Sequence, residues 1–244
     1  MFFRFLGSRR KAIDLDDIFS GPCFLLGGAP QLNDVKDRLS SSPVVKVAMN
    51  NTGTIVQPTI WIGADKAENF SASILQDPVP MKFAVISRRD NEVNGKQWKS
   101  LPNTYFMSTK QMKPKEFFVK NRDFAWDKNV FMMALQLVYR LGFREVYTVG
   151  CSFKITKDSQ YCYDTELDQK QVEYTQNTYG AALRQIREIL PLAEQEQFHI
   201  CSCTPDSKLN DLVDYQDLGT ALRRVEGMIP SHNTVNCKHP LPKS

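Results

Sequence analysis

The feature that most constrains the fold of this chain is a repeated alternation of short apolar runs with helical patterns. Six runs rich in β-branched and apolar residues are bounded by Gly, Pro, Asn or Asp, which is typical of buried strands. These runs are Cys23–Gly27, Val44–Met49, Thr59–Gly63, Lys82–Ser87, Glu145–Gly150 and Phe198–Ser202. Because helical patterns lie between several of them, the sequence predicts an α/β fold with a mostly parallel sheet flanked by helices.

The clearest helical pattern covers Asn129–Leu141, whose apolar residues recur with the spacing of one helix face. Gly142 follows at the position where a helix commonly ends. Two further helices are expected over about Tyr179–Glu194 and Ser207–Asp214. The polar, tyrosine-rich stretch 154–178 is expected to form a long loop or lid.

The chain therefore divides into an N-terminal segment (1–21), one domain (22–228) that contains the lid, and a flexible tail (229–244). A length of 244 residues suits one large domain with small appendages. The apolar and basic segment 1–11 has two interpretations. It packs on the core, or it forms a short hook that contacts a membrane surface.

Charge and cysteine content narrow the class of protein. The net charge of +4 suits an anionic ligand and gives no specific signal for nucleic-acid binding. The six cysteines form no CxxC pattern, so we expect buried free thiols and a cytoplasmic, reducing location. With three histidines in all, a histidine-based metal site is not expected.

Three strand ends carry residues suited to ligand binding, because ligands of open α/β sheets bind at the carboxyl ends of strands. The first strand ends in the turn Gly27-Gly28-Ala29-Pro30, which lets the backbone approach a phosphate or serves only as a turn. Asn50 and Asn51 follow the second strand and either bind a nucleobase or ribose or form a turn. Asp65 follows the third and either binds a hydroxyl or a metal ion, or caps a helix.

A fourth segment with candidate ligand-binding residues consists of the predicted helix Asn129–Leu141, the strand Glu145–Gly150 and the tyrosine-rich stretch that follows them. Ser152 and Lys154 come directly after this strand, and Tyr161 and Tyr163 follow in the lid. Tyrosine hydroxyls on a lid bind a departing phosphate and exclude water, although tyrosines on an amphipathic surface also serve packing.

Residues Ala134–Phe153 resemble a segment shared by two related groups of proteins. These are the bacterial sialyltransferases of glycosyltransferase family 42 and the DUF115 proteins, which include archaeal 6-hydroxymethylpterin diphosphokinases. The turn Gly27–Gln31, Asn50 and the segment Cys201–Leu209 resemble further blocks of these groups, over roughly residues 22–215.

The resemblance implies a Rossmann-like nucleotide-binding domain that takes a CMP-sugar donor without a metal and transfers the sugar to an acceptor hydroxyl. It implies that Tyr161 is a lid tyrosine, that Lys154 stands at a second lid position, and that Ser207 belongs to the nucleotide site with Asn129. The family's histidine base falls near Tyr174, so Asp65 or Tyr174 is the candidate base. Two alternatives are a Mg²⁺-dependent diphosphokinase-like transferase, in which Asp65 holds the metal, and a non-catalytic binding protein.

Overall fold

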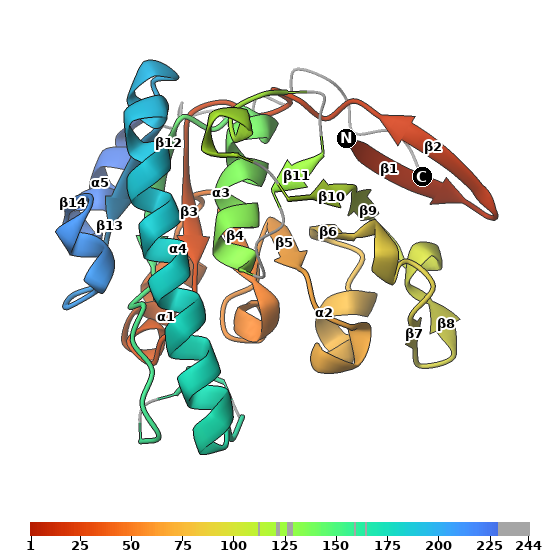
Figure 1. The fold of residues 1–244 in the computed structure, drawn as a ribbon, viewed down its shortest axis with the longest axis horizontal. Coiled ribbons are helices and arrows are strands. Elements are labelled where there is room, and N and C mark those ends of the chain that lie inside the picture. The colour runs from red at the N-terminus through yellow and green to blue at the C-terminus, as the bar shows by residue number, and fades with distance from the viewer. Residues whose placement is uncertain (112, 121–122, 126–128, 159, 164, 229–244) are drawn as a thin grey trace.

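The computed structural model describes residues 1–228 apart from residues 112, 121–122, 126–128, 159 and 164. Its centre is a ten-stranded sheet in the order β14-β13-β12-β3-β4-β5-β6-β9-β1-β2 (Figure 1). These strands are β1 (Phe2–Leu6), β2 (Arg9–Ile13), β3 (Pro22–Leu26), β4 (Lys46–Met49), β5 (Ile60–Gly63), β6 (Met81–Val85), β9 (Thr104–Met107), β12 (Glu145–Val149), β13 (His199–Ser202) and β14 (Asp214–Tyr215). All neighbours from β14 to β9 are parallel, which confirms the predicted α/β fold.

The strand order reverses once in the parallel part of the sheet. From β3 the chain proceeds through β4, β5 and β6 to β9 in one direction, and from β12 through β13 to β14 in the other. Strands β3 and β12 are hydrogen-bonded neighbours, so the reversal lies between them. This switch point is where open α/β sheets bind ligands, beyond the carboxyl ends of the strands.

Helices cover both faces of the sheet. They are α1 (Leu32–Ser41), α2 (Ala72–Gln76), α3 (Val130–Leu141), α4 (Gln169–Gln195) and α5 (Leu218–Met228). On β3, Cys23 and Leu25 belong to the core that contains α3 and α4, whereas Phe24 and Leu26 belong to the core that contains α1 and α5. Because β3 is buried on both faces, its sequence is continuously apolar rather than alternating.

The N-terminal residues extend the sheet. Strands β1 and β2 form an antiparallel hairpin, and β1 pairs with β9. Phe2 and Phe3 are buried, in agreement with the interpretation that this segment packs on the core. Residues 1–21, expected to lie outside the domain, thus contribute two strands to its sheet. Two small sheets complete the described strands: β7 (Glu92–Val93) with β8 (Lys96–Gln97), and β10 (Thr109–Lys110) with β11 (Phe124–Ala125).

The predicted lid at 154–178 is wrong in its second half. Helix α4 begins at Gln169, ten residues before the expected Tyr179, so residues 169–178 are helical. Asp168 starts the helix with a capping box, because its side chain accepts from the Gln171 N–H and the Gln171 side chain accepts from the Asp168 N–H. The first turns are polar and largely exposed, which removed the apolar periodicity that identifies a helix.

The predicted helix over Ser207–Asp214 is also wrong. Only a short 3₁₀ helix, Lys208–Asp211, forms there, and Asp214 already belongs to β14. Helix α5 was not predicted, although its apolar residues pack against the core that contains α1. The expected tail at 229–244, with His232, Cys237 and His239, lies outside the described residues.

The described cysteines are free and mostly buried, as expected. Cys23, Cys151, Cys162 and Cys203 are buried and Cys201 is half-buried. In the part of the chain that the structure describes, no helix combines the length and the apolarity needed to cross a membrane.

Candidate functional site

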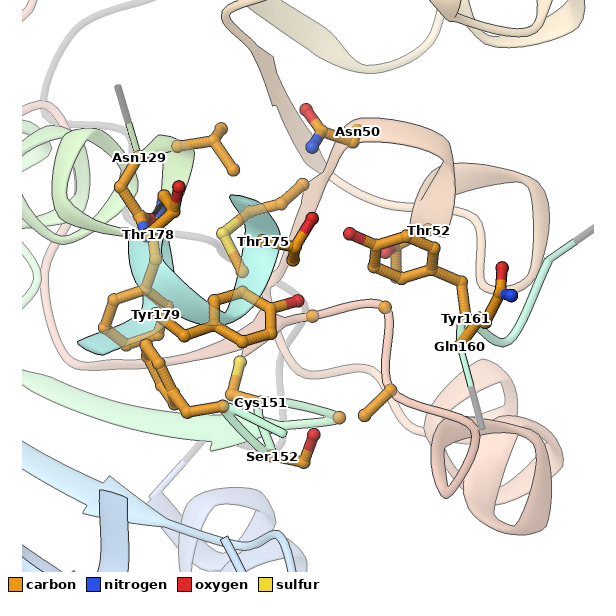
Figure 2. A pocket seen from close by; sticks show the side chains of 18 of the residues that line it. Asn50, Thr52, Asn129, Cys151, Ser152, Gln160, Tyr161, Thr175, Thr178 and Tyr179 are labelled. Atoms are coloured by element: carbon orange, nitrogen blue, oxygen red, sulfur yellow. Dashed lines mark hydrogen bonds between the residues drawn. The ribbon is translucent and has the colours of Figure 1, made fainter. Parts of the chain in front are cut away.

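A cavity of about 320 Å³ lies at the carboxyl ends of the strands around the switch point (Figure 2). The turns after β3, β4, β5 and β12 form one side, and the N-terminus of α3, residues 152–154, 160, 161 and 163, and the first turns of α4 form the rest. The sheet topology therefore converges four strand ends on one concave site, which is the expected place for a ligand in this architecture.

Two glycines pack against each other where β3 and β12 end. Gly27 N–H donates to the Val149 carbonyl and Ala29 N–H donates to the Gly150 carbonyl, each at 2.8 Å. A Cβ on Gly27 would lie 2.5 Å from the Gly150 oxygen, and Gly150 has a φ of +67°. Only glycine fits this approach.

Two tyrosines stack above the glycine turn. The rings of Tyr161 and Tyr163 lie 5.1 Å apart and nearly parallel, at 7°. A Cβ on Gly28 would lie 3.0 Å from Tyr163 Cε1 and 3.1 Å from Tyr161 Cδ1, so any larger residue would press on both rings. Between them, Cys162 N–H donates to the Gly28 carbonyl at 2.8 Å and its carbonyl accepts from Asn33 Nδ2 at 3.1 Å. The tyrosine segment is therefore held over the turn by backbone hydrogen bonds.

Asn50 and Thr52 bring buried polar atoms to the cavity. Asn50 has a left-handed φ of +52°, which asparagine tolerates better than most residues, and its carbonyl accepts from Trp61 Nε1 at 2.7 Å. The side-chain atoms Asn50 Oδ1 and Thr52 Oγ1 are buried and have no hydrogen-bond partner among the described residues. An unpaired buried polar group costs about 1–3 kcal/mol.

Asp65 lies at the β5 side of the cavity. Its side chain is exposed at the rim, yet the surrounding walls remove enough water to raise the pKa of its carboxyl, while the charge of Arg88 opposes that rise. Burial raises the pKa of Tyr163, and the charges of Tyr161 and Asp65 contribute in the same direction. Asp65 and Tyr163 are therefore close enough to interact across the cavity.

Helix α3 begins at the cavity. Asn129 caps it, because its Oδ1 accepts from the Phe131 N–H at 2.8 Å. Phe131 packs edge-on against Phe153 at 4.9 Å, and Phe153 in turn contacts Tyr179 at 5.6 Å. The positive end of the helix dipole thus faces the cavity, and an anion there is stabilised. The Asn129 Oδ1 atom is already engaged in the hydrogen bond that caps the helix.

One face of α4 closes the cavity with Tyr174, Thr175, Thr178 and Tyr179. Their spacing of one, four and five residues places them on adjacent positions of that face. Tyr174 is 60% exposed, whereas Tyr179 is half-buried, and desolvation together with the nearby Tyr161 raises its pKa. Gln176 Nε2 donates to the Ile155 carbonyl at 2.7 Å and ties the helix to the segment before the tyrosines.

Most of the site residues expected from the sequence line this cavity. They are Gly27, Gly28, Ala29, Asn50, Asp65, Asn129, Ser152, Lys154, Tyr161, Tyr163 and Tyr174. Pro30, Asn51 and Ser207 are not among its lining residues. The Pro30 carbonyl accepts from Asn33 N–H at 3.0 Å, Asn51 bonds the Asn69 carbonyl and the Ser71 N–H, and Ser207 Oγ donates to the Cys151 carbonyl at 2.6 Å. These three shape the turns around the site.

Sequence reasoning missed Thr52, Thr175, Thr178 and Tyr179, which also line the cavity. Thr52 lies two residues after Asn50, Thr175 and Thr178 lie in the segment expected to be a loop, and Tyr179 stands at the expected start of the helix. The recurrence of Thr175, Thr178 and Tyr179 at helical spacing is the signal that would have found them, had the start of α4 been recognised.

The cavity has one carboxylate, Asp65, and one lysine, Lys154, among its described lining residues. Within the described ranges, no three His, Cys, Asp or Glu side chains cluster as metal ligands. His199 begins β13, away from this cavity.

The comparisons with known proteins are sparse. No protein-family model matches the sequence, and no curated protein is significantly similar to it. Among solved structures, the MAf glycosyltransferase from Magnetospirillum magneticum AMB-1 matches with 12% identity and a TM-score of 0.48. The match covers 89% of this chain and 35% of the other, so the chain spans about a third of that protein's length. A likeness at this level transfers no property to this chain, and the resemblance to family 42 and DUF115 stays a prediction.

Proposed function

We propose that this protein is a nucleotide-sugar-dependent transferase, in which a CMP-sugar is the first candidate donor and a hydroxyl group is the acceptor. The observation that carries the proposal is the pair of buried, unpartnered atoms, Asn50 Oδ1 and Thr52 Oγ1, in a cavity at the switch point of the sheet. A nucleobase or ribose supplies the hydrogen-bond donors and acceptors that an amide and a hydroxyl need.

The other side of the cavity suits the phosphate of the nucleotide. The glycine turn lines the cavity without large side chains, the N-terminus of α3 favours an anion, and Lys154 contributes a positive charge. The hydroxyls of Tyr161 and Tyr163 donate to a departing phosphate oxygen and keep water from it. Such donors stabilise charge that develops as the bond between sugar and phosphate breaks.

Asp65 is the candidate base. In the proposed step, the acceptor oxygen forms a bond to the anomeric carbon, its proton passes to the Asp65 carboxylate, and the nucleotide leaves with the electrons of the broken bond. The raised pKa of Asp65 brings the carboxylate nearer to the pH at which a base works well. A tyrosine such as Tyr174 ordinarily titrates near ~10, so it is the weaker candidate and orients the acceptor instead.

Calorimetry with CMP, UDP, GDP and their sugars tests the proposal. Thr52→Val removes the unpartnered hydroxyl at constant shape and is expected to weaken nucleotide binding by about tenfold, which corresponds to about 1.4 kcal/mol. Thr148→Val is the matched control, because Thr148 Oγ1 on β12 is equally buried and unpartnered but does not line the cavity. Equal effects of the two variants on binding, or no binding of any nucleotide, would overturn the proposal.

The same titration separates the alternatives. Binding of ATP only in the presence of Mg²⁺, lost in Asp65→Asn, would indicate the diphosphokinase-like transferase, because Mg²⁺ is usually held by one or two carboxylates and substrate phosphates. Nucleotide binding without transfer to any acceptor would indicate a non-catalytic binding protein.

A further inference from the structure

Arg88 stands beside Asp65 at the same edge of the sheet. It ends the 3₁₀ turn Ile86–Arg88, which follows β6 directly. Strands β5 and β6 are parallel neighbours with Gly63 opposite Ala84, so the residues after both strands emerge side by side. The two loops are also joined by a hydrogen bond, in which the Ala67 N–H donates to Asn91 Oδ1 at 3.4 Å.

The guanidinium of Arg88 has no described partner. The side chain is half-buried, its Nε is excluded from solvent, and no hydrogen bond or ion pair joins it to another described residue. Its neighbour Arg89 differs, because Arg89 Nη2 pairs with Asp90 at 3.2 Å and Nη1 donates to the Ile86 carbonyl at 3.3 Å. The terminal amines of Arg88 are not among the buried unpartnered atoms, so this part of the guanidinium is open to an anionic ligand.

The surroundings of Arg88 favour a negatively charged ligand. Its charge opposes the rise in the pKa of the Asp65 carboxyl, so the two groups lie within electrostatic reach. A second hollow of about 380 Å³ adjoins the same turn and is lined by Arg10, Arg89 and Lys99, with Asp90 as its acid. The edge of the sheet beyond Asp65 thus carries an excess of positive charge.

We propose that the acceptor is an anionic sugar, whose carboxylate or phosphate is bound by Arg88 while its hydroxyl faces Asp65. This inference rests on the proposed transferase function. A planar guanidinium binds carboxylate and phosphate oxygens through two parallel hydrogen bonds, which the two terminal amines of Arg88 are suited to make. Arg88 is thereby a specificity residue for the acceptor, separate from the nucleotide.

Matched acceptors test this assignment. With the nucleotide sugar that binds, kcat/KM is measured for galactose, galacturonic acid and galactose 6-phosphate, of which the last two separate carboxylate from phosphate. We expect kcat/KM at least tenfold higher for one of the charged sugars than for galactose. Arg88→Gln should bring the ratio of kcat/KM for the charged sugar to kcat/KM for galactose close to one, Arg88→Lys should restore the preference in part, and Arg89→Gln should retain it.

Binding measurements distinguish the two proposals. Nucleotide affinity should be the same in wild type and Arg88→Gln, and a loss there would assign Arg88 to the nucleotide and overturn this inference. Equal use of charged and neutral sugars by a protein that binds nucleotide would overturn it as well, with the transferase function intact. If no nucleotide binds, the transferase function fails. Calorimetry with galactose 6-phosphate alone then decides whether Arg88 binds an anionic sugar, and no binding overturns that too.

Discussion

The guanidinium of Arg140 on α3 and the carboxylate of Asp16 form a two-bonded ion pair inside the protein. Arg140 Nε lies 2.8 Å from Asp16 Oδ1, and Nη2 lies 3.1 Å from Oδ2. The same guanidinium packs over the rings of Phe2 and Phe124, each 4.7 Å from its centre. This pair joins the chain that follows the N-terminal hairpin to the helix whose N-terminus faces the cavity.

Asp16→Asn should destabilise the protein by about 3 kcal/mol, because it removes the negative charge that makes two hydrogen bonds to the buried Arg140 guanidinium. The free energy of unfolding in urea measures this loss. Glu68→Gln is the control, since the Lys66–Glu68 pair is exposed and such pairs contribute about 0–1 kcal/mol. A loss in Asp16→Asn no larger than in the control would contradict the role assigned to the buried pair.

Gly27→Ala should destabilise the protein and disturb the floor of the cavity. The new Cβ meets the Gly150 oxygen at 2.5 Å and Cys151 Sγ at 2.6 Å, and the oxygen belongs to the backbone, which yields little. We expect a loss of about 1–3 kcal/mol, as for other overpacked sites. Gly180→Ala on α4 should instead stabilise by about 0.5–1 kcal/mol, because its Cβ has room and alanine favours helices. Thermal unfolding of both variants measures whether the melting temperature falls in Gly27→Ala and rises in Gly180→Ala.

Most of the parallel strands were predictable, because each of these is a continuous apolar run bounded by turn residues. Strand β9 was not predictable, because Thr104–Met107 lies in a region of mixed polarity. It is identified as a strand only by its pairing with β6 and β1 in the folded protein. The two-residue strand β14 is too short to carry a pattern. The hairpin at the N-terminus depends on pairing with a strand a hundred residues later, which local sequence does not encode.

Some residues of the site could likewise be predicted from the sequence, and others could not. Gly27, Asn50 and Asp65 were predictable, because they directly follow apolar strands and parallel strands end at one edge. Thr52 and Arg88 were not, because their significance lies in being buried without a partner, and that depends on the folded surroundings. The capping box of Asp168 and Gln171 can be recognised as a sequence motif. The polar residues after it have no apolar periodicity, so the N-terminal part of α4 could not be predicted from the pattern.

Lys82 should make stability depend on alkaline pH. It is fully buried on β6, its Nζ donates to the Asp77 carbonyl, and burial lowers its pKa from 10.5 to about 8. Below pH 8 the folded protein bears the full cost of a buried charge, and between pH 8 and 10.5 the unfolded chain binds the extra proton, so stability rises with pH.

Lys82→Met abolishes this contribution. Relative to the variant, the wild type should therefore gain up to about 3 kcal/mol in free energy of unfolding between pH 7 and 10.5. Urea denaturation at both pH values measures the difference. A difference between wild type and variant that stays constant over this range would show that Lys82 is not held in a desolvated position.

Asp65→Asn should separate catalysis from stability. Because desolvation raises the pKa of Asp65 above its ordinary value of 3.8, its carboxylate is disfavoured in the folded state. The resulting cost is absent below pH 3.8, appears as the pH rises through the folded pKa, and is fully present at neutral pH. The variant should thus melt at a higher temperature than wild type at pH 7, with a gap that narrows as the pH falls. Asp90→Asn should change the melting temperature with the opposite sign, because a hydrogen bond from Lys99 lowers the pKa of Asp90.

If Asp65 is the base, Asp65→Asn lowers kcat by about 10²–10⁴-fold and leaves nucleotide affinity unchanged. Wild-type activity then falls as the pH drops through the raised pKa of Asp65. An Asp65→Asn variant that is less stable than wild type at pH 7, yet fully active, would refute both assignments at once.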